Sequence, residues 1–440
     1  MGKSIIAVGG YSEVGRNMTA LHVDDEILIF DMGLYLPSVI DIEEEIEHYS
    51  AHDLRHIKAI PDDTILDNDR KQVKAIIIGH AHLDHLGALP YLAGKYRAPI
   101  IGTPYTMNVA RKIIKDKGRG VQNRLRVLNT GNRMKITQKL SVEFLNITHS
   151  TAQCAMIVVH TPYGAVAYCL DYKLDNSPLL GKKPDYERIK ELKDVKCLIL
   201  DSLDSKIDGK TPSEMVAKEL LSDVLLHTDN KGKGIIVTTF SSHIARLKSI
   251  VECGQKLGRR VVFLGRSLNR YVQAAREAKI VNFDHVDIVA YRQKIAAKLK
   301  EVSKNSSKYL VVCTGNQGEK NSVLSRIAND ELAYKFQKDD HVIFSCRTIP
   351  VERNIKDREK LEKNLKSKGV RIFTNIHASG HPHSQDNLEL IRMVGAEHVI
   401  PAHGDYVVVK PGADIAVSLG YVLGKTVHIL KNGDVLELTK

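Results

Sequence analysis

Four side chains of the kind that bind metals follow a single apolar stretch. The sequence IIIGHAHLDHLGALP carries His80, His82, Asp84 and His85 directly after a run typical of a buried strand. Residues two apart on an extended turn project the same way, so His80 and His82 can hold one ion together. Asp84 and His85 begin the next element and can face a second ion. Imidazole and carboxylate ligands suit zinc or manganese, and this order of residues is rare by chance, so we predict a metal site.

Further ligands are expected at the ends of other strands. His149 closes VEFLNITHS, Asp171 follows GAVAYCL, and His403 closes HVIPAH. A single histidine at the end of a strand usually has a structural role. Three such residues, in a chain that already contains H-x-H-x-D-H, indicate that one metal site draws on distant parts of the sequence.

The stretch TNIHASGHPHS, residues 374–384, holds three more histidines around a serine and a glycine. The side chains of His377, Ser379 and His381 can donate hydrogen bonds, and Gly380 permits a close approach of the backbone. The alternative is a polar loop with solvated histidines. The residue types alone leave open whether this stretch is a separate site or part of the metal site. We assign no role to His383 and expect it at the surface.

Alternating strand and helix patterns must position these residues. Short apolar runs predict eight strands, most of them covered on both faces. They are residues 75–80, 98–103, 196–202, 234–240, 260–265, 308–315, 341–346 and 398–403. Helix-like segments fill the gaps, which is typical of an α/β architecture. Residues 18–33 predict an antiparallel hairpin instead. Thr211 as the cap, Pro212 at the first position and Glu214 predict the start of a helix.

The composition limits the class of protein. The chain has 440 residues, of which 43% are hydrophobic, enough for two or three domains. Lysine and arginine exceed aspartate and glutamate by 12, which favours a polyanionic partner such as nucleic acid. No apolar run is long enough for a membrane span. The six cysteines form no C-x-x-C pair and no export signal begins the chain, so we expect free, buried thiols in a cytoplasmic protein.

H-x-H-x-D-H followed by a separate histidine, a separate aspartate and a late histidine resembles the metallo-β-lactamase fold, an αββα sandwich. The resemblance implies two divalent ions, Zn²⁺ with Mn²⁺ as the alternative. The implied ligands are His80, His82 and His149 for one ion, Asp84, His85 and His403 for the other, and Asp171 as the bridge. Asp31 in IFDMG matches the early acid of the fold, which supports the metal loop.

The branch of the fold that the chain resembles can be specified, because more than two hundred residues separate Asp171 from His403. That length fits the β-CASP branch of the fold, whose members cut nucleic acids and carry an inserted α/β domain. The segments GGYSEVGRNM, DGKTPSE, TTFSSHIAR, FLGRSLNR, CTGNQGE, LSRIA and HASGH resemble the ribonuclease J family, in its short archaeal form. The resemblance covers nearly the whole chain. It implies a metallo-β-lactamase domain of residues 1–202 and 366–440 around a doubly wound β-CASP domain of residues 203–365.

The family also implies roles for the remaining residues. His381 would face the scissile phosphate and be oriented by Asp201, and Asp84 would orient the attacking hydroxide or act as a base. The implied binding residues for the 5′ phosphate of an RNA end are His377, Ser379, Gly380 and His381. We therefore expect a 5′-to-3′ exoribonuclease for 5′-monophosphorylated single-stranded RNA, acting in RNA decay and processing as a homodimer.

Three alternatives stay open. The first is an endoribonuclease of the β-CASP type that processes RNA 3′ ends, although such enzymes lack the H-x-S-G-H stretch. The second is a small-molecule hydrolase such as a lactonase, against which the long insertion, Asp201 and the positive charge count. The third is a non-catalytic RNA-binding scaffold, which would have lost metal ligands. Two local departures from the family lie near the ligands: HSTAQCAM follows the third motif, and Leu170 precedes Asp171 in place of glycine.

Overall fold

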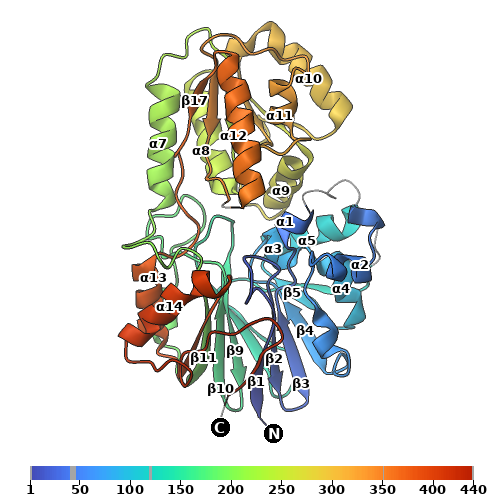
Figure 1. The fold of residues 1–440 in the computed structure, drawn as a ribbon, viewed down its shortest axis with the longest axis vertical. Coiled ribbons are helices and arrows are strands. Elements are labelled where there is room, and N and C mark those ends of the chain that lie inside the picture. Colours follow the sequence, from blue (N-terminus) through green and yellow to red (C-terminus); the bar gives the residue numbers. More distant parts are fainter. Residues whose placement is uncertain (1, 40–45, 118–120, 350, 439–440) are drawn as a thin grey trace. The chain divides into compact units, whose positions relative to one another are not determined.

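The structure is a computed structural model that describes residues 2–39, 46–117, 121–349 and 351–438. The chain forms two units (Figure 1). The first consists of Met1–Asn176, Gly181–Thr211 and Ser379–Lys440, and the second of Ser177–Leu180 and Pro212–Ala378. The units therefore change after Thr211 and after Ala378, whereas the domain boundaries expected from the sequence fall after residues 202 and 365. The functional domain limits stay a prediction.

The first unit contains two sheets. The seven-stranded sheet has the order β19-β1-β2-β3-β4-β5-β6. Its strands are β1 (Lys3–Gly9), β2 (Met18–Val23), β3 (Glu26–Phe30), β4 (Val73–Ile77), β5 (Ile100–Gly102), β6 (Leu125–Val127) and β19 (Val435–Leu438). Strands β2 and β3 pair antiparallel across Asp24 and Asp25, which confirms the predicted hairpin. Strands β3, β4, β5 and β6 run parallel, so their carboxyl ends lie at the same edge.

The second sheet has six strands in the order β18-β11-β10-β9-β8-β7. They are β7 (Arg133–Lys135), β8 (Ser141–Asn146), β9 (Ala155–Thr161), β10 (Gly164–Cys169), β11 (Val195–Asp201) and β18 (His398–Ala402). Strands β10, β11 and β18 are mutually parallel, although β18 comes almost two hundred residues after β11. The returning chain thus enters the same sheet and ends at the same edge.

Apolar side chains from both sheets meet in one core. Leu28, Phe30 and Ile77 of the first sheet pack with Ile157 and Ile199 of the second, and all are fully buried. A second core lies between the six-stranded sheet and helices α6 (Tyr186–Lys190), α13 (Ser384–Val394) and α14 (Tyr406–Ser418). Helices flank both sides of the sandwich (Figure 1). Each sheet therefore packs against the other sheet on one face and against helices on the opposite face, and the predicted αββα sandwich is confirmed.

The other helices of the first unit lie in the connections of the seven-stranded sheet. They are α1 (Leu36–Val39), α2 (Ala51–His56), α3 (Leu83–Leu86), α4 (Leu89–Leu92) and α5 (Pro104–Asp116), with the 3₁₀ turns η1 (Ile46–His48), η2 (Asp63–Leu66) and η3 (Ala93–Lys95). Among the described residues, no helix combines the length and hydropathy that crossing a membrane requires. All six cysteines are buried free thiols, as predicted.

The second unit is built on a parallel sheet of six strands in the order β14-β13-β15-β12-β16-β17. The strands are β12 (Ile235–Thr238), β13 (Arg260–Leu264), β14 (Asp287–Val289), β15 (Tyr309–Cys313), β16 (His341–Phe344) and β17 (Arg371–Phe373). Its helices are α7 (Glu214–Leu226), α8 (Ile244–Lys256), α9 (Arg266–Glu277), α10 (Arg292–Lys304), α11 (Val323–Ala328) and α12 (Glu352–Ser367), with the turn η4 (Ser306–Lys308). Strand order and connections confirm a doubly wound α/β fold.

The predicted start of helix α7 is wrong by two residues. Ser213, not Thr211, caps the helix, and its side chain accepts a hydrogen bond from the backbone N–H of Met215. Glu214 does not close a capping box, because its carboxylate binds the guanidinium of the fully buried Arg246 at 2.6 Å. Thr211 instead donates its hydroxyl hydrogen to the carbonyl oxygen of His381 or to Asp386, each 2.8 Å away. Tertiary partners therefore outweighed the local capping signal.

Candidate active site

Strand ends deliver all of the residues predicted to bind metal. His80, His82, Asp84 and His85 follow β4, and the other three follow β8, β10 and β18. Strands β8, β10 and β18 run in the same direction, because β9 pairs antiparallel with both β8 and β10. Their carboxyl ends therefore meet at one edge of the six-stranded sheet. The structure thus brings together all seven predicted residues, including those that lie more than three hundred positions apart in the sequence.

Three imidazoles and Asp171 form the first group. The Nδ1 atom of His82 lies 3.1 Å from Nε2 of His80 and 3.1 Å from Nε2 of His149. The Oδ2 atom of Asp171 lies 3.8 Å from His80 Nε2 and 3.7 Å from His149 Nε2. Burial, reinforced by the neighbouring imidazoles, holds the pKa values of His80 and His149 well below their usual range. These rings are therefore neutral near pH 7 and keep a lone pair for a cation.

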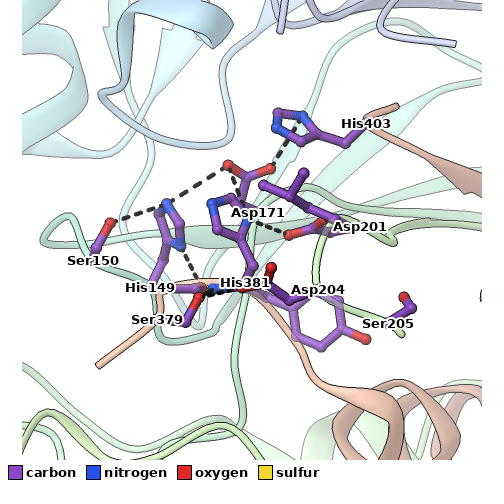
Figure 2. Close-up of polar contacts among 12 residues, drawn as sticks. His149, Ser150, Asp171, Asp201, Asp204, Ser205, Ser379, His381 and His403 are labelled. Atoms are coloured by element: carbon purple, nitrogen blue, oxygen red, sulfur yellow. Dashed lines mark hydrogen bonds and ion pairs between the residues drawn. The ribbon is translucent and has the colours of Figure 1, made fainter. Parts of the chain in front are cut away.

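Asp84, His85 and His403 form the second group, which also includes Asp171. His85 Nε2 lies 3.4 Å from Asp171 Oδ2 and 3.5 Å from Asp84 Oδ2. His403 Nε2 lies 3.7 Å from Asp84 Oδ2, and His403 Nδ1 lies 3.5 Å from Asp171 Oδ1. One carboxylate therefore faces both groups, with His149 and His403 on its two sides (Figure 2). This is the position expected of a bridging ligand.

The donor set fits divalent metal ions. Tetrahedral ligands about 2.0–2.1 Å from a zinc ion lie about 3.3 Å apart, close to the 3.1 Å between the imidazole nitrogens. Among the described residues, the buried atoms His80 Nδ1 and Asp171 Oδ1 have no hydrogen-bond partner. Buried polar atoms are rarely left without a partner, and a bound cation would satisfy Asp171 Oδ1. The fold and this cluster together imply divalent ions, while the individual ligand assignments remain a prediction.

A buried acid, Asp31, supports the second group through the ring nitrogen of His85 that faces away from Asp171. Asp31 Oδ2 accepts a hydrogen bond from His85 Nδ1 at 2.7 Å and one from the hydroxyl of Tyr168 at 2.8 Å. Its other oxygen accepts from the backbone N–H of Gly79 at 2.9 Å. These contacts fix the ring of His85 with Nε2 toward Asp171, which agrees with the supporting role expected of Asp31.

His381 lies next to the two groups and is held by an acid. Its Nδ1 atom is 2.7 Å from Asp201 Oδ2 and 3.8 Å from Asp171 Oδ2 (Figure 2). Burial opposes a charge on this ring, but Asp201 and Asp171 outweigh it and raise the pKa of His381 to about 9. The imidazole of His381 is therefore positively charged near pH 7, with a proton on both ring nitrogens, and one of these protons is available for general-acid catalysis.

Ser379 and Gly380 make contacts that the sequence did not predict. The hydroxyl of Ser379 donates to Asp204 at 2.6 Å and accepts the backbone N–H of His381 at 3.1 Å. The carbonyl oxygen of Gly380 accepts a hydrogen bond from His149 Nδ1 at 2.6 Å. Both residues therefore hold parts of the site in place. Sequence reasoning missed Asp204, and the one signal for it was its position three residues after Asp201. The binding of a 5′ phosphate by Ser379 and Gly380 remains a prediction.

The stretch 374–384 divides between the two units, because residues 374–378, His377 among them, belong to the second and residues 379–384 belong to the first. Burial lowers the pKa of His377 to about 3, and the nearby basic side chains of Arg246, His243 and Arg347 add to this effect. The Nδ1 atom of His377 is buried and has no hydrogen-bond partner among the described residues. His383, expected at the surface, is half-buried and caps the N-terminus of α13.

Replacing Gly380 with alanine is expected to weaken the first group. The added Cβ would lie 2.8 Å from Cε1 of His149 and 2.9 Å from Cβ of Ser150, so the imidazole must move. Supporting residues of metal sites typically contribute about 10- to 100-fold in affinity, and we expect a loss of that size for the ion nearest His149. Zn²⁺ titration of the metal-free protein measures it. Gly94→Ala is the matched control, because nothing lies within 4 Å of its added Cβ, and equal behaviour of the two variants would contradict the prediction.

Comparisons with known proteins place this site in a class. Residues 15–168 match the metallo-beta-lactamase superfamily, and residues 232–358 match the beta-CASP domain of ribonuclease J. A crystal structure of a protein of unknown function from Enterococcus faecalis has the same fold, with a TM-score of 0.65 over both whole chains at 15% identity. Fold and site therefore define a metallo-β-lactamase protein of the β-CASP branch.

Full-length relatives narrow the class to one family. The chain is 45% identical to Ribonuclease J of Methanocaldococcus jannaschii, covering 99% of both chains. It is 43% identical to Ribonuclease J of Pyrococcus abyssi, covering 99% of this chain and 97% of that protein. Identity to Ribonuclease J 1 of Streptococcus pyogenes is 31%, over 99% of this chain and 74% of that protein. The chain belongs to the ribonuclease J family, and the predicted resemblance to its archaeal members is confirmed.

Proposed function

We propose that this protein is a metal-dependent ribonuclease that acts mainly as a 5′-to-3′ exoribonuclease on 5′-monophosphorylated single-stranded RNA. The observation that carries the proposal is the convergence of the seven predicted metal ligands beside the His381–Asp201 pair in a chain of the ribonuclease J family. A net charge of +12 suits a polyanionic substrate. A cytoplasmic location, a role in RNA decay and a homodimer complete the proposal.

Two divalent ions are part of this proposal, Zn²⁺ with Mn²⁺ as the alternative. The residues that would hold the first ion are His80, His82, His149 and Asp171, and those for the second are Asp84, His85, Asp171 and His403. When bound, such ions neutralise charge on a phosphodiester and lower the pKa of water toward about 7. Asp31 would keep the ring of His85 in the orientation that this role needs.

The remaining residues would orient the substrate and handle the proton. With its pKa raised to about 9, His381 holds a proton on both ring nitrogens at neutral pH. Nδ1 donates to Asp201, and Nε2 would donate to the leaving oxygen of the scissile bond. His85 and His403 outweigh the opposing effect of burial and lower the pKa of Asp84 below its usual range. Asp84 is therefore better suited to orient the attacking water than to remove its proton.

The stretch from His377 to His381 would bind the terminal phosphate and position the first linkage for cleavage. One RNA labelled at its 5′ end tests this role when it is prepared with a monophosphate, a triphosphate or a hydroxyl. We expect labelled mononucleotide from the monophosphorylated RNA, and much slower release from the other two. Equal cleavage of the three RNAs into internal fragments would contradict the exonuclease proposal.

One observation favours the endoribonuclease alternative. The hydroxyl hydrogen of Ser379 is donated to Asp204, and a carboxylate directly behind this hydroxyl is unfavourable for a phosphate. An enzyme that reads no 5′ phosphate would release internal fragments in the same experiment, whatever the chemistry of the 5′ end.

A further inference from the structure

Asn17 is a buried amide that contacts the second group at three points. It lies immediately before β2, and only 1% of its surface is exposed. Its backbone N–H donates to the carbonyl oxygen of Asp84 at 3.0 Å, and its carbonyl accepts the N–H of Gly33 at 3.0 Å. Two backbone hydrogen bonds therefore fix the position of Asn17 independently of its side chain.

The orientation of the amide follows from its partners. Nδ2 lies 3.1 Å from the backbone carbonyl oxygen of Asp84, which can only accept a hydrogen bond. The NH₂ group must therefore face Asp84, and it also lies 3.1 Å from His85 Nε2. The oxygen of the amide, Oδ1, is left facing His403, and the hydrogen-bond network fixes this orientation.

This orientation determines which nitrogen of His403 carries the proton. His403 Nδ1 lies 3.1 Å from Asn17 Oδ1, which can only accept, so Nδ1 must be the donor. Asp171 Oδ1, the other acceptor near Nδ1, is farther away at 3.5 Å. In the neutral ring the lone pair is then on Nε2, the atom that faces Asp84 at 3.7 Å.

The surrounding backbone is shaped to keep Asn17 and His403 together. The backbone N–H of His403 donates to the carbonyl oxygen of Gly10 at 2.9 Å, and His403 itself has a φ of 68°. A Cβ on Gly10 would lie 2.3 Å from Asn17 Oδ1, so only glycine leaves room for the amide. Segments from opposite ends of the chain thus converge on a single hydrogen bond between two side chains.

We propose that Asn17 is a positioning residue that selects Nε2 of His403 as the metal-binding nitrogen and so controls the affinity of the second ion. The inference rests on the proposed ligand role of His403. Asn17 makes no contact with His80, His82 or His149 among its hydrogen bonds, and the first ion is therefore outside its influence.

Equilibrium dialysis of the metal-free protein against buffered Zn²⁺ tests the inference without any activity measurement. We expect two binding steps in the natural protein. In Asn17→Ala the first step stays in place, and the second moves to about 10- to 100-fold higher free Zn²⁺. Asn17→Leu fills a similar volume without an oxygen for His403 Nδ1 and is expected to show the same shift of the second step as Asn17→Ala. In a His403→Ala background, Asn17→Ala should add no further shift, because the two residues act as a unit.

A matched control separates the positioning of His403 by Asn17 from a general loosening of the loop between β1 and β2, residues 10–17. Asn432 holds the same loop through the backbone N–H of Tyr11 at 3.0 Å and through Glu13, and it touches none of the metal-binding residues. Asn432→Ala should lower the melting temperature and leave both steps unchanged.

The outcomes separate this inference from the proposed function. Two normal steps in Asn17→Ala would overturn the inference alone, whereas fewer than two steps in the natural protein would overturn the metal assignment and this inference with it. If Asn17→Ala does not fold, Asn17→Leu decides, because two normal steps in this variant would overturn the inference and a shift of the second step alone supports it.

Discussion

Replacing Asp171 with asparagine is expected to lower the rate of RNA hydrolysis by a factor on the order of 10³ or more and to weaken both bound ions, since metal catalysis contributes several kcal/mol. The carboxylate of Asp171 is the group shared by the two clusters, with five imidazoles between 3.4 and 3.8 Å from its oxygens. The asparagine keeps the shape but removes the charge that offsets two cations. Single-turnover hydrolysis and Zn²⁺ content measure the two effects.

A second buried aspartate in the same region serves as the control. Asp175 lies four residues further on, where its carboxylate is 3.4 Å from Lys173 Nζ. Asp175→Asn is expected to lower stability, because Lys173 loses its charged neighbour, and to keep both ions. If Asp171→Asn bound two ions with the affinity of the natural protein, the bridging role would be wrong.

Replacing His381 with alanine is expected to slow RNA hydrolysis by about 10²- to 10⁴-fold, the usual contribution of a general acid. The protonated ring is held by Asp201 at 2.7 Å and lies 3.8 Å from Asp171, the carboxylate that both clusters share. Zn²⁺ content should not change, because the seven predicted ligands remain. The expected loss is therefore in the chemical step and appears in single-turnover rates.

A substrate with a good leaving group separates acid catalysis from other roles of His381. Hydrolysis of bis(p-nitrophenyl) phosphate needs no proton on the leaving oxygen, so His381→Ala should slow it much less than RNA hydrolysis. His383→Ala, two residues away at the helix cap, should leave both rates within a few fold. Equal slowing of both substrates in His381→Ala would exclude the general-acid role.

The convergence of the candidate metal ligands could be predicted in part because much of its signal is local. His80, His82, Asp84 and His85 lie within six residues after a buried strand, and a strand end is where a parallel sheet places polar side chains. All eight predicted strand segments overlap a strand in the structure, because apolar runs reflect burial on both faces. The strand end pointed to His403 as a ligand, but its grouping with Asp84 and His85 depended on the resemblance to a family, since its neighbours in space are not its neighbours in sequence.

The supporting contacts could not be predicted for the same reason. The hydrogen bond between Asn17 and His403 spans 386 residues, and the one between His149 and Gly380 spans 231. Nothing in the residue types near Asn17 indicates which nitrogen of which histidine it will meet. The start of α7 shows the opposite failure, because a plausible local cap at Thr211 was outweighed by partners 170 residues or more away.

Each of the two groups that share Asp171 is expected to bind one ion. A crystal grown with Zn²⁺ and measured at the zinc absorption edge would locate both ions. We predict two anomalous peaks, one among His80, His82, His149 and Asp171, and the other among Asp84, His85, Asp171 and His403. A single peak, or peaks away from these side chains, would contradict the account.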